Sequence, residues 1–342
     1  MLSATMNSMS AIRLGTRAST LATTQSEMVA GMLRSEGLDV DLTTITTRGD
    51  TSTTSLAAMG GIGVFASAIR ATLLKGEADI AVHSFKDLPT GRPLGLAIGA
   101  VPARADPRDA LVARDGLTLH DLPQEASVGT GSPRRAAQLL AVRPDLTIVD
   151  IRGNVDTRLG RVKGLGHYAK GGGKEDLDAV VLAASGLARL GHSGTVTEFL
   201  DPSVVLPAPA QGALAVECRT ADSRHGKLAK ALARIDDRRT RLAATAERAV
   251  LSHLEAGCAA PIGALAQLKP VSGSSPQVLT LDVVVATVDG SRIIREQVSV
   301  ELPAEVDSAL AAAHTLGVTA AEELLDDGAA DVADLKASGS TR

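Results

Sequence analysis

Aromatic side chains are almost absent from this 342-residue sequence, which contains no Trp, one Tyr and three Phe. Proteins that bind single-stranded nucleic acid stack successive bases on several aromatic rings. So few rings do not form such a surface, and a formal net charge of −4 does not favour a general polyanion binder. We therefore expect no nucleic-acid partner.

Cysteine is also scarce, since Cys218 and Cys258 are the only two. There is no CxxC motif and the seven histidines show no paired ligand spacing, so we predict no metal site. No apolar run has the length of a membrane span, and no secretory signal is visible. These absences predict a reduced, cytoplasmic protein without a membrane partner. The acidic balance and the lack of a visible apolar patch favour a monomer.

The basic residues are mostly arginine, because 26 Arg and 9 Lys make up the total of 35. A planar guanidinium group binds carboxylates and phosphates through two parallel hydrogen bonds. A GC-rich genome would give the same bias together with abundant alanine, so the positions of the arginines must decide their meaning. The length of the chain predicts two or three domains.

The stretch ADIAVHSFKDLP, residues 78–89, is the centre of the pattern. Its apolar run over 79–82 predicts a short strand, and Pro89 disfavours helical geometry before it, so we predict an open turn after the strand. Ligands of open α/β sheets bind at the carboxyl ends of strands. Lys86 and Asp87 would stand there beside a phenyl ring, where charge and desolvation tune a carboxylate. The same residues are compatible with an ordinary solvated turn.

Two halves of the chain repeat one order of elements. Expected strands and helices alternate in the first half at 12–15, 21–34, 40–46, 64–75 and 79–82, and in the second half at 127–129, 133–142, 146–151, around Arg158 and at 177–183. Short matches accompany them, because GTxxS and TRGD in the first half resemble GTxS and IRGN in the second. The repeat predicts a duplicated α/β domain, with Ser19 and Ser132 as helix N-caps. The polar segment 51–63 is a candidate mobile loop.

The last third of the chain has a different pattern. The Pro/Gly-rich segment 206–218 would return the chain to the first domain through a strand. Expected helices and strands then follow at 237–255, 262–268, 278–288, 293–300 and 306–325, with a hairpin at Asp289-Gly290. They predict a small α+β domain. The expected domains are a first α/β lobe at 10–103 plus about 211–233, a second at 104–210, and a C-terminal domain at 234–330.

Six arginines stand at or near predicted strand ends, namely Arg17, Arg134, Arg135, Arg152, Arg158 and Arg189. Two of these places are also helix N-termini, where free amides attract anions. Their repetition in two similar domains favours an anion-lined cleft with one carboxylate at its centre, suited to a substrate that bears several carboxylates. The alternative is a non-catalytic binder of carboxylated or phosphorylated ligands, like a two-lobed solute-binding protein.

Cys258 lies in LEAGCAAPIG, just beyond an expected helix. A lone cysteine is usually a small buried hydrophobe. This one is expected in a loop, so covalent attachment or nucleophilic chemistry remains open beside that interpretation.

Longer motifs occur along the chain, namely HSFKDLP, DPRDAL (106–111), VGTGSPRR (128–135), IRGNVDTRL (151–159), LAASGLARLG (182–191), PAPAQGA (207–213), TAERA and LEAGCAAPIG. Together they resemble the motifs of the porphobilinogen deaminase (hydroxymethylbilane synthase) family. The resemblance covers residues 13 to 325 in the family's order. It implies an α/β fold class, with two duplicated periplasmic-binding-protein-like lobes plus a small α+β C-terminal domain.

The resemblance also implies a cofactor and a reaction. The cofactor is a dipyrromethane joined through a covalent thioether to Cys258, and four porphobilinogen molecules are joined head to tail with release of ammonia. Asp87 resembles the catalytic aspartate, which would assist the loss of ammonia and stabilise positive pyrrole nitrogens. Residues that match substrate- or cofactor-binding positions are Arg17, Ser19, Ser84, Lys86, Thr130, Ser132, Arg134, Arg135, Arg152, Arg158, Arg189 and Gln211.

Three places depart from the family's pattern. Ala58 and Ile62 stand where many members carry lysines in the mobile loop, which puts loop closure by those charges in doubt. Ala210 replaces a common glycine before Gln211, and the glycine-rich stretch 164–174 is longer than usual and is expected to be a surface loop.

Overall fold

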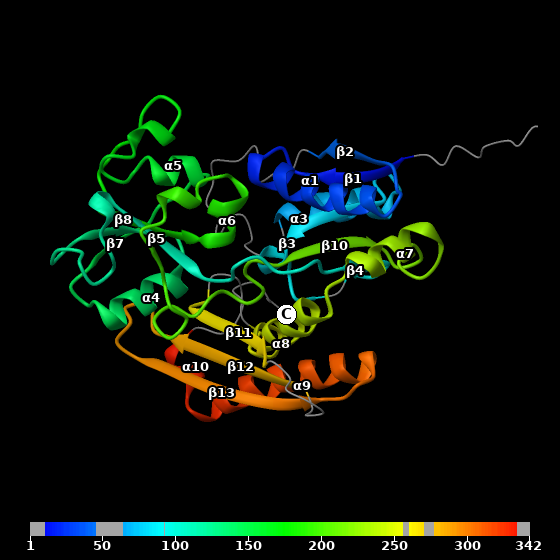
Figure 1. The fold of residues 1–342 in the computed structure, drawn as a ribbon. Helices are drawn as coiled ribbons and strands as arrows, with labels where there is room; N and C mark the ends of the chain where they lie inside the picture. The colour runs from blue at the N-terminus through cyan, green and yellow to red at the C-terminus, as the bar shows by residue number, and fades with distance from the viewer. Residues whose placement is uncertain (1–10, 46–63, 92, 256–259, 270–276, 334–342) are drawn as a thin grey trace, which may run out of the picture.

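A computed structural model of the chain describes residues 11–45, 64–91, 93–255, 260–269 and 277–333. These residues form two five-stranded mixed sheets and one three-stranded antiparallel sheet (Figure 1). Each sheet has helices packed against it. The expected fold class, two α/β lobes and a small α+β domain, is confirmed.

The first lobe is built on a sheet in the order β2-β1-β3-β10-β4. Strands β1 (Ile12–Thr16), β2 (Val40–Thr44) and β3 (Ile80–Ser84) are parallel, and β10 (Leu214–Arg219) lies antiparallel between β3 and β4 (Leu96–Ala100). Its helices are α1 (Thr20–Ser35), α3 (Val64–Leu74) and α7 (Gly226–Ile235). The return of the chain through 206–218 is therefore confirmed, because β10 completes the first sheet.

The second lobe repeats this arrangement in the order β7-β6-β8-β5-β9. Strands β6 (Ser127–Gly129), β7 (Thr147–Val149) and β8 (Ala179–Ala183) are parallel, and β5 (Asp109–Ala113) lies antiparallel between β8 and β9 (Glu198–Phe199). Its helices are α4 (Pro133–Val142), α5 (Val155–Leu159) and α6 (Ala184–Arg189). The chain crosses between the lobes twice, through residues 101–108 before β5 and through residues 200–213 before β10. In both lobes the antiparallel strand directly follows one of these crossings, so the duplication extends to the order of the strands.

The third domain consists of one small sheet and the helices that cover it. Strands β11 (Ile262–Leu268), β12 (Gln277–Ala286) and β13 (Ile293–Leu302) pack with α8 (Arg238–His253), α9 (Val306–Asp326) and α10 (Ala329–Val332) around one apolar core. Its other face contacts the second lobe, where Leu206 packs against Leu265 and Val284. Figure 1 shows this domain below both lobes, with α8 beneath the crossings.

Several local predictions are confirmed by the backbone. Helix α4 and strand β11 have the predicted bounds, and Ser19 caps α1 by accepting a hydrogen bond from the Ala22 amide at 3.3 Å. Gly290 turns the β12–β13 hairpin with a φ of +71°. Most of the glycine-rich stretch 164–174 is exposed, as expected of a surface loop.

Other local predictions need correction. The turn after β3 is wound into a single 3-10 turn, Phe85–Asp87, while Leu88 keeps the extended conformation that Pro89 imposes. Ser132 occupies the N-cap position of α4, but its side chain makes no capping hydrogen bond. Among the described residues, none of the helices is both long enough and apolar enough to cross a membrane.

Candidate active site

The 3-10 turn that follows β3 carries the predicted Lys-Asp pair. The Leu88 amide donates to the Phe85 carbonyl at 3.3 Å and closes this turn. Asp87 is exposed on it, whereas Lys86 is partly buried. The sequence thus places one solvent-facing carboxylate at the carboxyl end of a buried strand, as expected for a site in an open α/β sheet.

Arg248 of the third domain binds the backbone of this turn. Arg248 on α8 donates to the carbonyl oxygens of Phe85 and Leu88, both at 2.9 Å, and of Pro89 at 2.8 Å. Its guanidinium also lies over the Phe85 ring, 4.5 Å from the centroid. The sequence analysis missed Arg248, although it stands in the quoted TAERA motif. It fixes the backbone of the turn relative to α8.

Lys86 reaches away from the turn towards the second crossing between the lobes. Its ammonium donates to the Gln211 side-chain oxygen at 3.2 Å. Burial lowers the pKa of Lys86 to about 8, with the Asp87 charge opposing this shift and Arg135 adding to it. Lys86 therefore loses part of its charge just above neutral pH.

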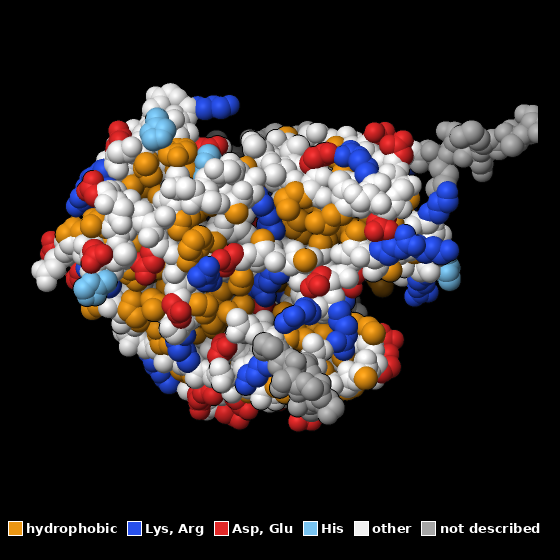
Figure 2. Space-filling view, in the orientation of Figure 1, with side chains coloured by type: hydrophobic (Ala, Val, Ile, Leu, Met, Phe, Trp, Pro, Cys, Tyr) orange, Lys and Arg blue, Asp and Glu red, His pale blue; other side chains and the backbone are white. Residues whose placement is uncertain are grey.

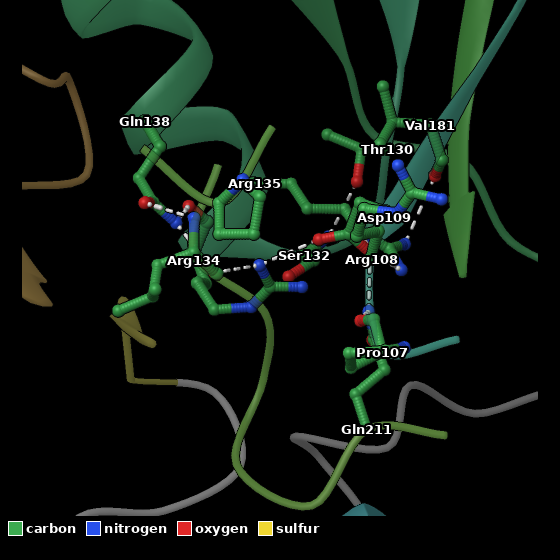
Figure 3. Close-up of polar contacts among 12 residues, drawn as sticks. Pro107, Arg108, Asp109, Thr130, Ser132, Arg134, Arg135, Gln138, Val181 and Gln211 are labelled. Atoms are coloured by element: carbon green, nitrogen blue, oxygen red, sulfur yellow. Dashed lines mark hydrogen bonds and ion pairs between the residues drawn. The ribbon is translucent and has the colours of Figure 1, made fainter. Parts of the chain in front are cut away.

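Gln211 is fully buried and links this lysine to the second lobe. Its side-chain nitrogen donates to the Pro107 carbonyl and to Asp109 Oδ1, both at 2.8 Å. Figure 3 shows Gln211 below Asp109, with the amide aimed at the carboxylate. The predicted site residue Gln211 thus bridges the two lobes.

Two predicted anion-binding residues, Arg134 and Arg135 at the start of α4, are buried against Asp109 (Figure 3). Arg135 donates to Asp109 Oδ1 from Nε at 3.0 Å and from NH2 at 2.7 Å, and to the Val181 carbonyl at 3.0 Å. Arg134 Nη1 forms an ion pair with Asp109 Oδ2 at 2.8 Å, although the angles at this contact are not those of a hydrogen bond. The same nitrogen donates a hydrogen bond to the Leu206 carbonyl at 2.6 Å.

Asp109 is the centre of this cluster, and the sequence analysis did not identify it. It is fully buried at the first residue of β5, within the quoted DPRDAL motif. Burial raises its pKa, but the charges and hydrogen bonds of Arg134 and Arg135 outweigh that effect and hold the pKa well below its usual range. Asp109 is therefore ionised at neutral pH.

The other predicted arginines are less tightly held. Arg158 donates to the Gly153 carbonyl at 2.9 Å, and its pKa is lowered by burial and by the Arg135 charge. Arg189 donates to the Gly212 carbonyl at 2.7 Å beside Gln211, and its buried Nε has no hydrogen-bond partner in the part of the chain that the structure describes. Within the described ranges, neither forms an ion pair. Arg152 is exposed, 3.5 Å from Asp150.

The remaining predicted residues lie at the ends of strands or just after them. Ser84 exchanges hydrogen bonds with the Gln25 side chain, and Thr130 Oγ1 accepts from the Ser132 amide at 3.2 Å. Arg17 is partly exposed at the end of β1, one turn before α1. Helix α1, which begins three residues after Arg17, contacts α6 of the second lobe, which ends at Arg189. Figure 2 shows a few Lys or Arg side chains between the two lobes, among others spread over the same face.

A second buried carboxylate, Glu247 on α8, joins the crossings to the third domain. It accepts from both terminal nitrogens of Arg104, at 2.6 and 3.0 Å, and from the amides of Ala210 at 2.5 Å and Ala266 at 2.8 Å. Arg104 also donates to the Gln211 carbonyl at 2.7 Å. Ala210 has a φ of +61°, in the region that favours glycine, which explains why glycine is common there. Neither Arg104 nor Glu247 was predicted.

Some predicted residues cannot be placed. Cys258, Ala58, Ile62 and the candidate mobile loop 51–63 lie outside the described residues. Among the residues that the structure does describe, no group of His, Cys, Asp or Glu could hold a metal ion.

The charges of the cluster fit a ligand with several carboxylates. Arg134 and Arg135 share the carboxylate of Asp109, and Gln211 links Lys86 to the same carboxylate, so positive charge gathers in a largely desolvated place. Arg158 and Arg189 add two further guanidinium groups without an ion pair among the described residues. An unpartnered buried donor such as Arg189 Nε is costly unless a ligand satisfies it.

The chain matches two family models. Residues 12–227 match "Porphobilinogen deaminase, dipyromethane cofactor binding domain" and residues 241–326 match "Porphobilinogen deaminase, C-terminal domain". A porphobilinogen deaminase of Cutibacterium acnes is 95% identical over 334 residues, which cover 98% of this chain and 100% of that protein. A porphobilinogen deaminase of Micrococcus luteus is 51% identical over 355 residues, 94% of each chain. The solved structure of apo YehZ from Escherichia coli has a TM-score of 0.40 at 14% identity over 67% of this chain and 86% of that chain, a value too low to carry weight.

Proposed function

The chain belongs to the porphobilinogen deaminase family, and from this premise we propose that Asp87 is its catalytic carboxylate and that the cationic cluster binds the carboxylates of cofactor and substrate. The protein is a transferase of tetrapyrrole biosynthesis, whose cofactor is dipyrromethane and whose substrate is porphobilinogen. Four porphobilinogens are joined head to tail with release of ammonia. What remains is to assign this chemistry to residues.

Asp87 is suited to the reacting centre because it is the exposed carboxylate on a turn that Arg248 holds in place. When porphobilinogen loses ammonia, positive charge develops on its pyrrole ring. A fixed carboxylate stabilises that charge, and it accepts and returns the proton that the coupling step moves. Because Asp87 keeps contact with solvent, ammonia and protons can leave towards water.

The binding residues follow from the surplus of cations. Each porphobilinogen carries one acetate and one propionate, so a growing chain presents many carboxylates. We assign Arg134, Arg135, Arg158, Arg189 and Lys86 to their binding, because these groups are buried or partly buried and, among the described residues, only Arg134 and Arg135 have a carboxylate as ion-pair partner. Arg17, Arg152, Ser19, Ser84, Thr130, Ser132 and Gln211 complete the proposed binding set. The single observation that carries this proposal is the cluster of buried cations that Gln211 links to Lys86, the chain neighbour of Asp87.

Cys258 is the proposed attachment point of the dipyrromethane. When bound, this group supplies the terminal pyrrole carbon to which the first substrate is joined. The described residues on either side, Glu255 and Ala260, follow α8 and precede β11, so Cys258 belongs to the connection between two elements of the third domain. Cys218 is unsuited to this task, because it is buried in β10 and burial raises the pKa of its thiol to about 11.

The same proposal extends to organisation and location. We propose domain bounds of 10–103 plus about 211–233, 104–210 and 234–330, and the grouping of the strands into three sheets supports this division. We propose that the protein works as a monomer in the cytoplasm, without nucleic-acid or membrane partners, because the proposed binding residues all come from one chain.

The intact mass of the denatured protein tests this proposal. A thioether does not exchange with thiols, so the wild-type protein should exceed its sequence mass by two linked pyrrole units after treatment with reductant. Cys258→Ala should lose that mass and nearly all activity, while Cys218→Ala should keep both. An active wild-type protein with a bare Cys258 would contradict the attachment site, and a binder without catalysis would show neither mass nor ammonia release.

A further inference from the structure

We propose that Asp109 is a positioning residue that aims the two arginines of α4 at the ligand carboxylates and, through Gln211, fixes the position of the Lys86 ammonium group. This proposal rests on the function proposed above and adds a residue that the sequence motifs did not single out. Asp109 itself touches protein groups, and it would act through the residues that it orients.

The geometry shows why this carboxylate can orient so many groups. Asp109 Oδ1 accepts from Arg135 Nε at 3.0 Å, Arg135 NH2 at 2.7 Å and Gln211 at 2.8 Å, while Oδ2 faces Arg134 NH1 at 2.8 Å. These donors come from α4 of the second lobe and from the crossing that returns to the first. Asp109 stands at the start of β5, immediately after the other crossing. One buried anion therefore sets the relative position of both lobes' site residues.

Arg134 and Arg135 are not held in the same way. Arg135 uses Nε, NH1 and NH2 for Asp109 and the Val181 carbonyl, so its guanidinium plane is fixed by the protein. Arg134 uses only NH1, for Asp109 and the Leu206 carbonyl, and within the described part of the chain its other nitrogens have no acceptor. Asp109 thus anchors one guanidinium fully and leaves an edge of the other for a ligand carboxylate.

Gln211 transmits this order to the catalytic turn. Its nitrogen donates to Asp109 and to the Pro107 carbonyl, and this fixes which end of the amide is the oxygen. That oxygen accepts from Lys86 at 3.2 Å. In Asp109→Asn, the side-chain NH₂ of the new residue can face the Gln211 nitrogen, which is also a donor. The Gln211 amide would then favour the flipped orientation, in which its nitrogen instead of its oxygen faces the Lys86 ammonium.

The charges around Lys86 give this arrangement a measurable consequence. Asp87 on its own turn and Asp109 on β5 raise its pKa, while Arg135 and Arg134 on α4 lower it together with burial. Arg248 on α8 lies at the adjacent carbonyls of the turn. Removing the Asp109 charge deletes one of the two anions and keeps both opposing cations, so Lys86 should lose its proton at lower pH.

The test compares Asp109→Asn with Asp106→Asn, a control three residues earlier whose carboxylate pairs with Arg108 and is partly exposed. In Asp109→Asn we expect KM for porphobilinogen to rise on the order of tenfold or more, since a buried charge pair is broken. We also expect the alkaline limb of kcat/KM to move down by about one pH unit. Lys86→Arg should abolish that limb, because arginine does not lose its proton in this pH range. Loss of the limb in this variant would show that it reports the titration of Lys86.

Gln211→Met keeps the carboxylate with its arginines but removes the bridge to Lys86. It should move the alkaline limb down while the intact mass still shows the two pyrrole units. This variant decides the matter if Asp109→Asn does not fold. An unchanged limb in Gln211→Met, or an unchanged limb and KM in folded Asp109→Asn, would overturn the positioning proposal. A wild-type protein without pyrrole mass would instead overturn the proposed function, so the two failures are distinguishable.

Discussion

Asp87 and its neighbour Lys86 show how adjacent residues acquire separate tasks. The turn exposes Asp87 to solvent and substrate, while Lys86 points into the protein towards Gln211. The opposite directions of these two side chains depend on the 3-10 turn. The open turn that Pro89 predicts would not fix the two side chains relative to one another.

Replacing Asp87 with Asn should separate chemistry from folding. Asn keeps the shape but removes the charge that stabilises a cationic transition state, so turnover should fall on the order of a hundredfold or more. The melting temperature should stay near the wild-type value, because Asp87 is exposed. Steady-state kinetics and thermal unfolding measure both quantities.

Asp115→Asn is a matched control for that experiment, since Asp115 is also an exposed aspartate in a three-residue 3-10 turn, Arg114–Gly116. Its φ of +57° is one that Asn tolerates. Turnover in Asp115→Asn should be unchanged. Near-normal turnover in Asp87→Asn would remove Asp87 from the catalytic step.

Asp79 shows a structural use of the same residue type, just before β3. It accepts from the Arg13 side chain at 2.9 and 3.1 Å and from Arg219 at 2.9 Å, and so ties β1 and β10 to the start of β3. Burial raises its pKa, but these hydrogen bonds outweigh burial and lower the pKa to about 2.

A carboxylate with a depressed pKa stabilises the folded state above its unfolded pKa, and that stability is lost as pH falls through the folded value. Asp79→Asn should therefore lower the free energy of unfolding by about 1 to 2 kcal/mol at pH 7, allowing for solvent screening. The difference from wild type should shrink between about pH 4 and pH 2. Urea denaturation across this range measures it, and a difference that stays constant with pH would contradict the ion-pair explanation.

Elements with strong local signals were predicted well, whereas those set by distant partners were not. Helix α4 begins with Ser-Pro and β11 is bounded by Pro261, so their bounds could be predicted. Strand β5 begins with a charged residue, and only the approach of α4 makes Asp109 a buried position. Strand β4 and helix α7 were missed as well. The site residues Asp109, Arg104, Glu247 and Arg248 could not be predicted for the same reason, since their partners are 19 to 163 residues away in the chain.

The β12–β13 hairpin is an element whose tip joins two domains. Gly290 has a φ of +71°, and a Cβ there would lie 2.5 Å from the Ala137 carbonyl and 2.8 Å from the Ala141 amide of α4. Arg295 on β13 donates to Gln138 of the same helix at 3.1 Å. The third domain is therefore docked on the second lobe through a close backbone contact.

Gly290→Ala should weaken this docking. The added methyl group meets backbone atoms that cannot move aside, and the positive φ adds strain of about 1 kcal/mol. Gly37→Ala is the control, because Gly37 has a φ of +81° but no atom within 4 Å of its Cβ position. The loss of unfolding free energy should be larger in Gly290→Ala, measured by urea denaturation. Equal losses in the two variants would show that the contact with α4 is unimportant.

At the scale of the whole molecule, three domains are held together at the places where the chain crosses between lobes. Both crossings pass over α8, and Arg104 from the first and Ala210 from the second meet Glu247. The next residue, Arg248, holds the catalytic turn. A shift of the third domain is thereby coupled to both crossings and to the backbone of the turn.

Glu247→Gln tests this coupling. Four N–H groups converge on the two carboxylate oxygens of Glu247, and an amide offers one oxygen while turning its own NH₂ against a donor. Arg104 would also lose its buried counter-charge, so the free energy of unfolding should fall by about 3 to 5 kcal/mol. Urea denaturation followed by far-UV circular dichroism measures this. Glu322→Gln, at an exposed glutamate on α9, should change stability by less than about 0.5 kcal/mol. If Glu247→Gln were as mild as that control, the crossings would be held by their apolar contacts instead, and the lobes would not depend on α8 for their relative position.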